Sequence, residues 1–170
     1  MKTFKRIIGI IVLVMALMAC DESGIGPDRN PDDVVAPMDF NATAKAVRSL
    51  QNVLGGDVEQ TLVKIIGEGE SNLLNQFSLT LSQYEAYHAG DEEFEIYDGT
   101  FRLENTEGDV LQGVYQGRGF RTNGFLEMEQ KWQVNQAIGS YAGMTGVFHA
   151  ELSDADRDGS LDISITGDLQ

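Results

Sequence analysis

The sequence is poor in cysteine, proline and basic residues, and each shortage restricts what the protein can be. Its 170 residues include one cysteine, Cys20, so no internal disulfide can form. Its three prolines all lie between residues 27 and 37. The apolar run at residues 7–18 is shorter than the roughly 20 residues that a membrane-spanning helix needs. The fold must therefore depend on its own hydrophobic core.

The shortage of basic residues restricts the partners. The chain has 12 Lys and Arg against 27 Asp and Glu, a formal charge of −15. Three of the 12 basic residues, Lys2, Lys5 and Arg6, precede the apolar run. Without these three, nine basic residues remain and the formal charge is −18. Such a surface repels nucleic-acid phosphates and anionic lipid headgroups, and we expect no nucleic-acid partner. The acids are spread along the chain, which favours a solvated exterior; an acidic face for a cationic partner is the alternative.

The first 20 residues have the layout of a secretory signal peptide, with a basic start followed by a short apolar run. Leu17-Met18-Ala19-Cys20 resembles the lipobox of bacterial lipoproteins, in which the cysteine thiol is diacylated and the signal is then removed. We therefore predict a signal peptide at 1–19 and lipidation of Cys20. The resemblance implies a lipid-anchored protein of the cell envelope, outside the cytoplasm, and leaves open which membrane holds it. An ordinary buried thiol is the alternative for Cys20.

Residues 20–37 predict a flexible tether after the lipidated cysteine. The segment combines prolines, glycines and aspartates with very little apolar content. Such a composition cannot bury enough surface to offset the entropy lost on ordering. The remaining residues, 38–170, have the length of one ordinary domain.

From residue 38 onward, apolar and polar residues alternate with a period of two, as in half-buried strands. Met128, Trp132 and Val134, for example, alternate with Glu127, Glu129 and Lys131. Glycine-containing turn signals separate the runs, the sharpest being Asn123-Gly124. The expected strands are 38–50, 59–68, 73–87, 97–104, 109–120, 124–135, 144–153 and 160–168.

Eight short-linked strands predict an all-β fold, an antiparallel up-and-down barrel, with a two-sheet sandwich as the alternative. Residues 43–50 also fit a helix, although their neighbours favour a strand. Gly113, Gly117 and Gly119 lie within one strand, where glycine often marks a bend of the barrel wall. The charged outward positions, such as Glu127 and Lys131, argue against a barrel that spans a membrane.

Residues 137–146, Ala-Ile-Gly-Ser-Tyr-Ala-Gly-Met-Thr-Gly, resemble the "GTGRFAGATG" segment of bacterial proteins with an allene oxide cyclase-like, or dirigent-like, barrel. Weaker likenesses lie at 67–77, 99–117 and 163–169. The resemblance implies an eight-stranded, calycin-like barrel. Its plant members guide cyclisation or radical coupling inside the barrel. The chain departs from the family pattern at Ser71-Asn72-Leu73, and no catalytic motif of the family is matched, so no catalytic residue carries over.

The most specific chemical pattern is an acidic loop near the C-terminus. Carboxylates at alternate positions before a glycine can converge on one hard cation, and they match the first nine places of a calcium loop. The predicted ligands are Asp154, Asp156, Asp158, the Ser160 carbonyl and Asp162. Ile165 stands where the bidentate acid of such a loop belongs, so binding of Ca²⁺ would be weak. An acidic hairpin that turns at Asp158-Gly159 is the alternative.

Two further groups of residues bear on ligand binding. Seven aromatic residues either line a ligand cavity or fill the core: Tyr84, Phe101, Tyr115, Phe120, Phe125, Trp132 and Phe148. Arg102, Arg118 and Arg121 either converge on an anion or pair with acids of neighbouring strands. With no catalytic signature, we expect a non-enzymatic, membrane-anchored barrel that needs no cofactor and binds a small hydrophobic ligand or a protein partner. The alternative is a cyclase- or dirigent-like enzyme acting on a hydrophobic small molecule inside the barrel, with polar groups pointing inward.

Overall fold

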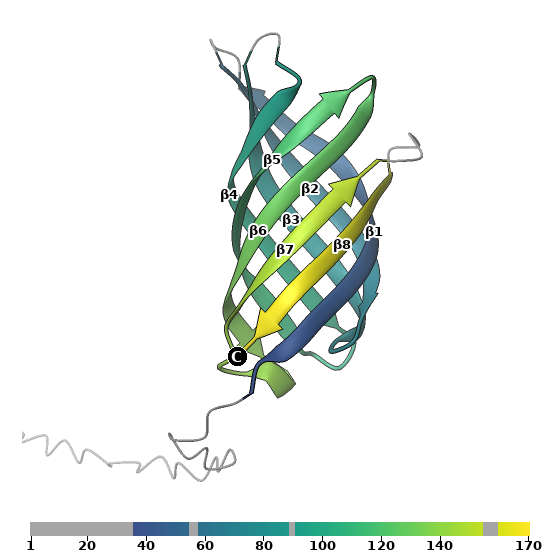
Figure 1. Ribbon diagram of the computed structural model, residues 1–170, viewed down its shortest axis with the longest axis vertical. Coiled ribbons are helices and arrows are strands. Elements are labelled where there is room, and N and C mark those ends of the chain that lie inside the picture. The colour runs from purple at the N-terminus through teal and green to yellow at the C-terminus, as the bar shows by residue number, and fades with distance from the viewer. Residues whose placement is uncertain (1–35, 55–57, 89–90, 155–159) are drawn as a thin grey trace, which may run out of the picture. The chain divides into compact units, whose positions relative to one another are not determined.

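The computed structural model describes residues 36–54, 58–88, 91–154 and 160–170, which form eight strands and one 3-10 helix (Figure 1). The predicted signal peptide, Cys20 and the tether up to residue 35 lie outside the described residues. In chain order the elements are β1 (Met38–Leu54), β2 (Val58–Ser71), β3 (Asn75–His88), β4 (Glu93–Asn105), β5 (Val110–Thr122), β6 (Phe125–Ile138), η1 (Gly139–Tyr141), β7 (Gly146–Ser153) and β8 (Ser160–Leu169). None of the described helical segments has the length and apolar character needed to cross a bilayer.

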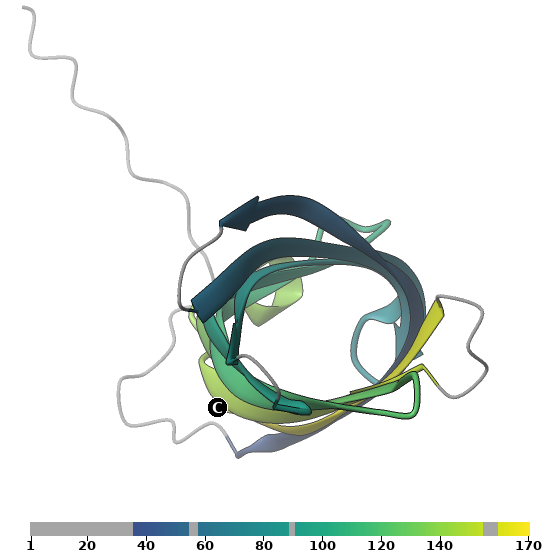
Figure 2. The same cartoon turned by 90° about the horizontal axis from the view of Figure 1, so that it is seen from above.

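Every strand pairs antiparallel with its neighbour in the chain, and β1 pairs with β8, so the sheet closes into a barrel (Figure 2). The predicted eight-stranded up-and-down barrel is confirmed, and the two-sheet sandwich is not. Residues 43–50 belong to β1 and are not helical. Closure leaves few unpaired strand edges, which would otherwise invite association with other chains.

Strand β4 begins earlier than the sequence predicts, at Glu93 rather than residue 97. The pairing of β4 with β5 shifts register between Ile96 and Gly99, and Asp98 has a positive φ of 48°. At this bulge the inward positions change from even to odd numbers, from Phe94 and Ile96 to Gly99 and Phe101. This change of parity interrupts the apolar–polar alternation from which a strand is predicted. The first half of β4 therefore could not be predicted from the sequence.

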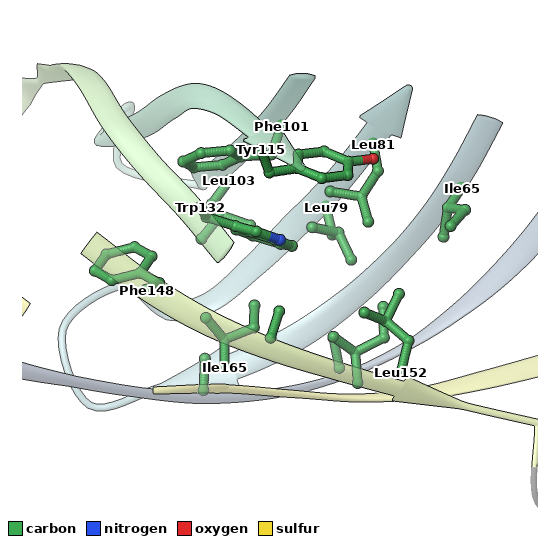
Figure 3. Close-up of a cluster of buried hydrophobic side chains, with 14 of the residues drawn as sticks. Ile65, Leu79, Leu81, Phe101, Leu103, Tyr115, Trp132, Phe148, Leu152 and Ile165 are labelled. Carbon is green, nitrogen blue, oxygen red and sulfur yellow. The ribbon is translucent and has the colours of Figure 1, made fainter. Parts of the chain in front are cut away.

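The barrel interior is filled largely by apolar side chains (Figure 3). As predicted, Met128, Trp132 and Val134 of β6 are buried, and the acids and lysine between them are exposed. Trp132 is fully buried and stacks on Phe101, with ring centroids 4.6 Å apart. The aromatic rings thus pack together in the middle of the barrel as a core.

Inward-facing glycines make room for these rings. A Cβ at Gly119 would lie 2.0 Å from the Phe94 ring, and one at Gly99 would lie 2.5 Å from the Tyr115 ring. Each ring therefore covers a glycine of the adjacent strand, where a side chain would collide with it. Four such cross-strand pairs are Gly69–Phe77, Gly99–Tyr115, Gly119–Phe94 and Gly167–Phe148. Gly113, by contrast, stands at a register shift between β5 and β6.

The C-terminus lies at one end of the barrel, called the lower end (Figure 1). A hydrogen bond bridges this end. The Tyr141 hydroxyl of η1 donates to the Leu73 carbonyl in the β2–β3 turn, at 2.6 Å. These segments belong to opposite walls, because β2–β3 and β6–β7 are four strands apart around the ring. Asp109 holds η1 by accepting a hydrogen bond from the Ser140 N–H at 2.7 Å. Leu74 is fully buried beside this bridge.

Candidate functional site

Polar side chains meet in the upper half of the barrel interior, opposite the bridged end. They come from β1, β3, β5 and β6 and are joined by hydrogen bonds. We call them the inner polar network, which consists of Arg48, Gln83, Glu85, Tyr87, Tyr115, Gln130 and Trp132.

At the centre of the inner polar network is Glu85, a carboxylate with no solvent exposure. Arg48 donates to it through Nε, at 3.3 Å, and through Nη2, which makes the contact two-pronged. Gln83 Nε2 donates to Oε1 at 2.7 Å, and the Tyr87 hydroxyl donates to Oε2. Four donors therefore converge on one carboxylate, as a buried charge requires.

The hydrogen bonds that link Trp132, Gln130 and Tyr115 to Gln83 all run towards Glu85, while Gln83 Nε2 makes a further contact with the Met128 sulfur at 3.7 Å. Trp132 Nε1 donates to Gln130 Oε1 at 2.8 Å, and Gln130 Nε2 donates to Gln83 Oε1 at 3.1 Å. An indole nitrogen can only donate and a carboxylate can only accept. Trp132 at one end and Glu85 at the other therefore fix the orientation of the two glutamine amides, Gln83 and Gln130, that lie between them. A chain with one direction polarises each of its bonds and strengthens the last one, at the carboxylate.

The two tyrosine hydroxyls of the inner polar network are held as donors. Burial raises the pKa of Tyr87 far above its usual range, and the charge of Glu85 raises it further. Burial likewise raises the pKa of Tyr115, whose hydroxyl donates to Gln83 Oε1 at 2.8 Å. Neither phenol loses its proton near neutral pH, so neither can act there as a base.

Two of the three residues that donate hydrogen bonds to Glu85 retain solvent exposure. The Arg48 side chain is 12% exposed and Tyr87 is half-buried, whereas Gln83 is fully buried. Leu50 is paired with the inward-facing Val63 and so lies on the inner face of the wall, yet it is 57% exposed. We call the upper inner surface formed by Arg48, Leu50 and Tyr87 the mouth.

The pairing of β1 in the described sheet changes beside Arg48. The pairing of β1 with β8 ends at Val47, opposite Ser160, whereas β1 continues to Leu54 and keeps its pairing with β2. The segment of β1 that carries Arg48 and Leu50 is therefore held from one side in the described sheet. A strand segment held from one side is easier to displace than one inside a sheet.

The predicted aromatic residues divide between the two faces of the wall. Phe101, Tyr115, Trp132 and Phe148 point inward and are buried. Three others, Tyr84, Phe120 and Phe125, take outward positions on β3, β5 and β6. The arginines do not converge on one anion site: Arg102 pairs with Glu104 and Arg118 with Glu129, each at 3.0 Å. Arg121 lies over the Tyr87 ring, 5.3 Å from its centroid.

The predicted calcium loop is described only at its two ends. Asp156 and Asp158 lie outside the described residues, whereas Asp154 directly follows β7 and Ser160 begins β8. Asp162 forms an ion pair with Lys45, at 3.2 Å. Within the described residues the buried Oδ1 of Asp154 has no hydrogen-bond partner, and no three potential metal ligands cluster there. Calcium binding stays a prediction.

An open concavity follows the outer wall and has an acidic lining. Among its residues are Glu68, Glu104, Glu129 and Glu151, with Lys45 as a basic member. Their carboxylates are solvated and well separated from the inner polar network, which does not line the concavity. The outer wall thus supplies a negative field, and the chemically specific groups lie inside.

The sequence interpretation missed Gln83, Glu85 and Gln130. Their signal is present: Phe77, Leu79 and Leu81 set the inward parity of β3, and the next two inward positions are polar. A polar residue at core parity is unusual, because burying it without partners is costly. Which partners satisfy it cannot be read from one strand, since they come from strands far apart in the chain.

Comparisons with protein families, with curated proteins and with solved structures find no match to this chain. The segment at 137–146, which carries the resemblance described above, forms the end of β6, η1 and the start of β7. There Gly139 and Gly143 have positive φ angles of 77° and 83°, which suit glycine. The family resemblance stays a prediction from the sequence.

Proposed function

We propose that this protein is a lipid-anchored, extracytoplasmic binding protein that takes up a small amphipathic molecule at the mouth. The observation that carries the proposal is a fully buried carboxylate, Glu85, with two hydrogen-bond partners, Arg48 and Tyr87, that retain solvent exposure. Specific polar groups beside an apolar surface are the usual composition of a small-molecule site. Leu50 supplies the exposed apolar surface.

The architecture supports uptake from one end. Tyr141 and Leu73 bridge the lower end, and aromatic rings fill the middle. Met38, the first residue of β1, pairs with Leu169 at that same lower end. The predicted tether, which precedes Met38, therefore joins the barrel away from the mouth.

Binding of Nile red, a neutral apolar dye, tests the proposal. Leu50→Glu places a charge on the inner face of the mouth, and Val114→Glu places one on the outer wall at similar exposure, 57% against 48%. We expect the unaltered protein to enhance the dye emission, Leu50→Glu to weaken binding about tenfold, and Val114→Glu to leave it unchanged. Equal losses in both variants, or no binding to the unaltered protein, would contradict uptake at the mouth.

A second candidate function is that of a cyclase- or dirigent-like enzyme acting on a hydrophobic small molecule inside the barrel. The convergence of Glu85, Arg48 and two tyrosine hydroxyls favours it, because fixed charges and dipoles can stabilise a reacting molecule. The test is to recover the molecule bound to Glu85→Gln protein and incubate it with unaltered protein. A new product formed only by the unaltered protein supports catalysis; an unchanged molecule supports binding alone.

A further inference from the structure

We infer that the molecule taken up at the mouth is a small organic cation with an apolar body, and that its cationic group replaces Arg48 at Glu85. The inference rests on the proposed function and adds the ligand class. In the described structure the guanidinium of Arg48, a residue of the barrel wall, is bound to the Glu85 carboxylate. A ligand of the same charge and shape would compete with it for the same carboxylate.

Arg48 is more easily displaced from Glu85 than Gln83 is. Its guanidinium retains 12% exposure, and it stands on the segment of β1 beyond Val47, where pairing with β8 has ended. Gln83 cannot leave in the same way, because it is fully buried and its own oxygen accepts from Tyr115 and Gln130. Release of Arg48 into solvent returns a charge to water and frees two acceptor positions on Glu85.

The charge at the upper end favours a cation over an anion. Exposed carboxylates dominate there: Glu59, Glu92, Glu93, Glu95 and Glu127. Of the described arginines at this end, Arg118 is paired with Glu129, and Arg121 lies over the Tyr87 ring and keeps its charge. Carboxylates around an opening raise the local concentration of cations and lower that of anions. An anion would also have to bind Arg48 while Glu85 holds it.

The contact geometry favours a guanidinium or amidinium group over a simple ammonium. Arg48 meets Glu85 with Nε on Oε1 and Nη2 on Oε2, a planar fork on a carboxylate. A ligand guanidinium can reproduce both bonds, whereas an ammonium is a compact point charge without that fork. The apolar body of the ligand would then lie against Leu50, the exposed leucine of the mouth.

Three probes with the same ring test the inference: benzylguanidinium, benzylammonium and phenylacetate. Binding to the full chain is followed by calorimetry and by emission of Trp132, the single tryptophan, which the inner polar network connects to Glu85. We expect benzylguanidinium to bind about tenfold more tightly than benzylammonium, and phenylacetate not to bind. Arg48→Met, which removes the competing group, should raise benzylguanidinium affinity about tenfold or more. Arg102→Met, whose arginine pairs with Glu104 on the outer wall, should change nothing.

Each contrary result has a defined meaning. Phenylacetate binding that is lost in Arg48→Met would make Arg48 the receptor of an anion; it would overturn the cation inference and leave uptake at the mouth intact. Benzylguanidinium affinity unchanged in Arg48→Met would overturn displacement. If Arg48→Met does not fold, Arg48→Lys provides the same comparison, because lysine is a weaker competitor and should raise affinity by a smaller factor. Absence of Nile red binding to the unaltered protein, or equal losses in Leu50→Glu and Val114→Glu, would instead overturn the proposed function itself.

Discussion

Replacing Arg48 by methionine tests whether the interior depends on its ion pair. Methionine keeps much of the side-chain volume but leaves the Glu85 carboxylate, which has no solvent exposure, without its cation. Removing one member of a buried pair typically costs about 3–5 kcal/mol. Gln83 and Tyr87 still donate to Glu85, so we expect the lower part of this range, about 3 kcal/mol, in the free energy of unfolding.

The assay is equilibrium urea unfolding followed by Trp132 emission, for Arg48→Met, Glu85→Leu and the double variant. Because the double variant removes both charges, it should recover most of the stability that Arg48→Met loses. The matched cycle at Arg118 and Glu129, whose side chains are 57% and 62% exposed, should give a coupling energy below about 1 kcal/mol. A loss below about 1 kcal/mol in Arg48→Met, or a double variant no better than the single, would refute the reasoning.

Four further outcomes are expected. Trp132→Ala should cost about 3–5 kcal/mol in urea unfolding, because the ring is fully buried. Cys20→Ser should release the protein from membranes or leave its signal uncleaved, as detergent partitioning would report. Millimolar Ca²⁺ should raise the melting temperature, and Asp156→Ala with Asp158→Ala should abolish the rise; no shift in the unaltered protein would leave an acidic hairpin. The Ser140 N–H and Asn105 lower the pKa of Asp109 below its ordinary value of 3.8. The contribution of Asp109 to stability is therefore complete above that value and is lost as the pH falls below it. The free energy of urea unfolding should accordingly differ less between pH 5 and pH 3 in Asp109→Asn than in the unaltered protein.

The fold could be predicted because each strand carries its own signal. The alternation around Trp132 places alternate residues inside and outside without knowledge of any other strand. The closed barrel was predicted from the number of strands and the shortness of their connections, and both can be read from the sequence without knowing which strands pair. The start of β4 could not be predicted, because the bulge at Asp98 reverses the parity within one strand. The covering of glycines by rings also escaped prediction, since Gly119 and Phe94 belong to different strands.

The inner polar network could be predicted only in part. Gln83 and Glu85 are recognisable as polar residues at core parity, and Arg48 continues the inward series of Ala44 and Ala46 in β1. Their pairing depends on the register around the whole barrel, because 37 residues separate Arg48 from Glu85 along the chain. Aromatic residues were the more conspicuous candidates for a ligand site, yet Trp132 mainly fills the core. The chemically specific groups are the polar ones beside it.

The central claim, that a cation reaches Glu85 through the mouth, is tested most directly by nuclear magnetic resonance. Trp132 is the only tryptophan, so its indole N–H gives a single signal at one end of the inner polar network. Titration with benzylguanidinium should shift this signal and the side-chain amide signals of Gln83 and Gln130, and leave the backbone amide of Val114 on the outer wall unmoved. Shifts confined to Val114 and other outer-wall residues, with the Trp132 and Gln83 signals unchanged, would contradict the account.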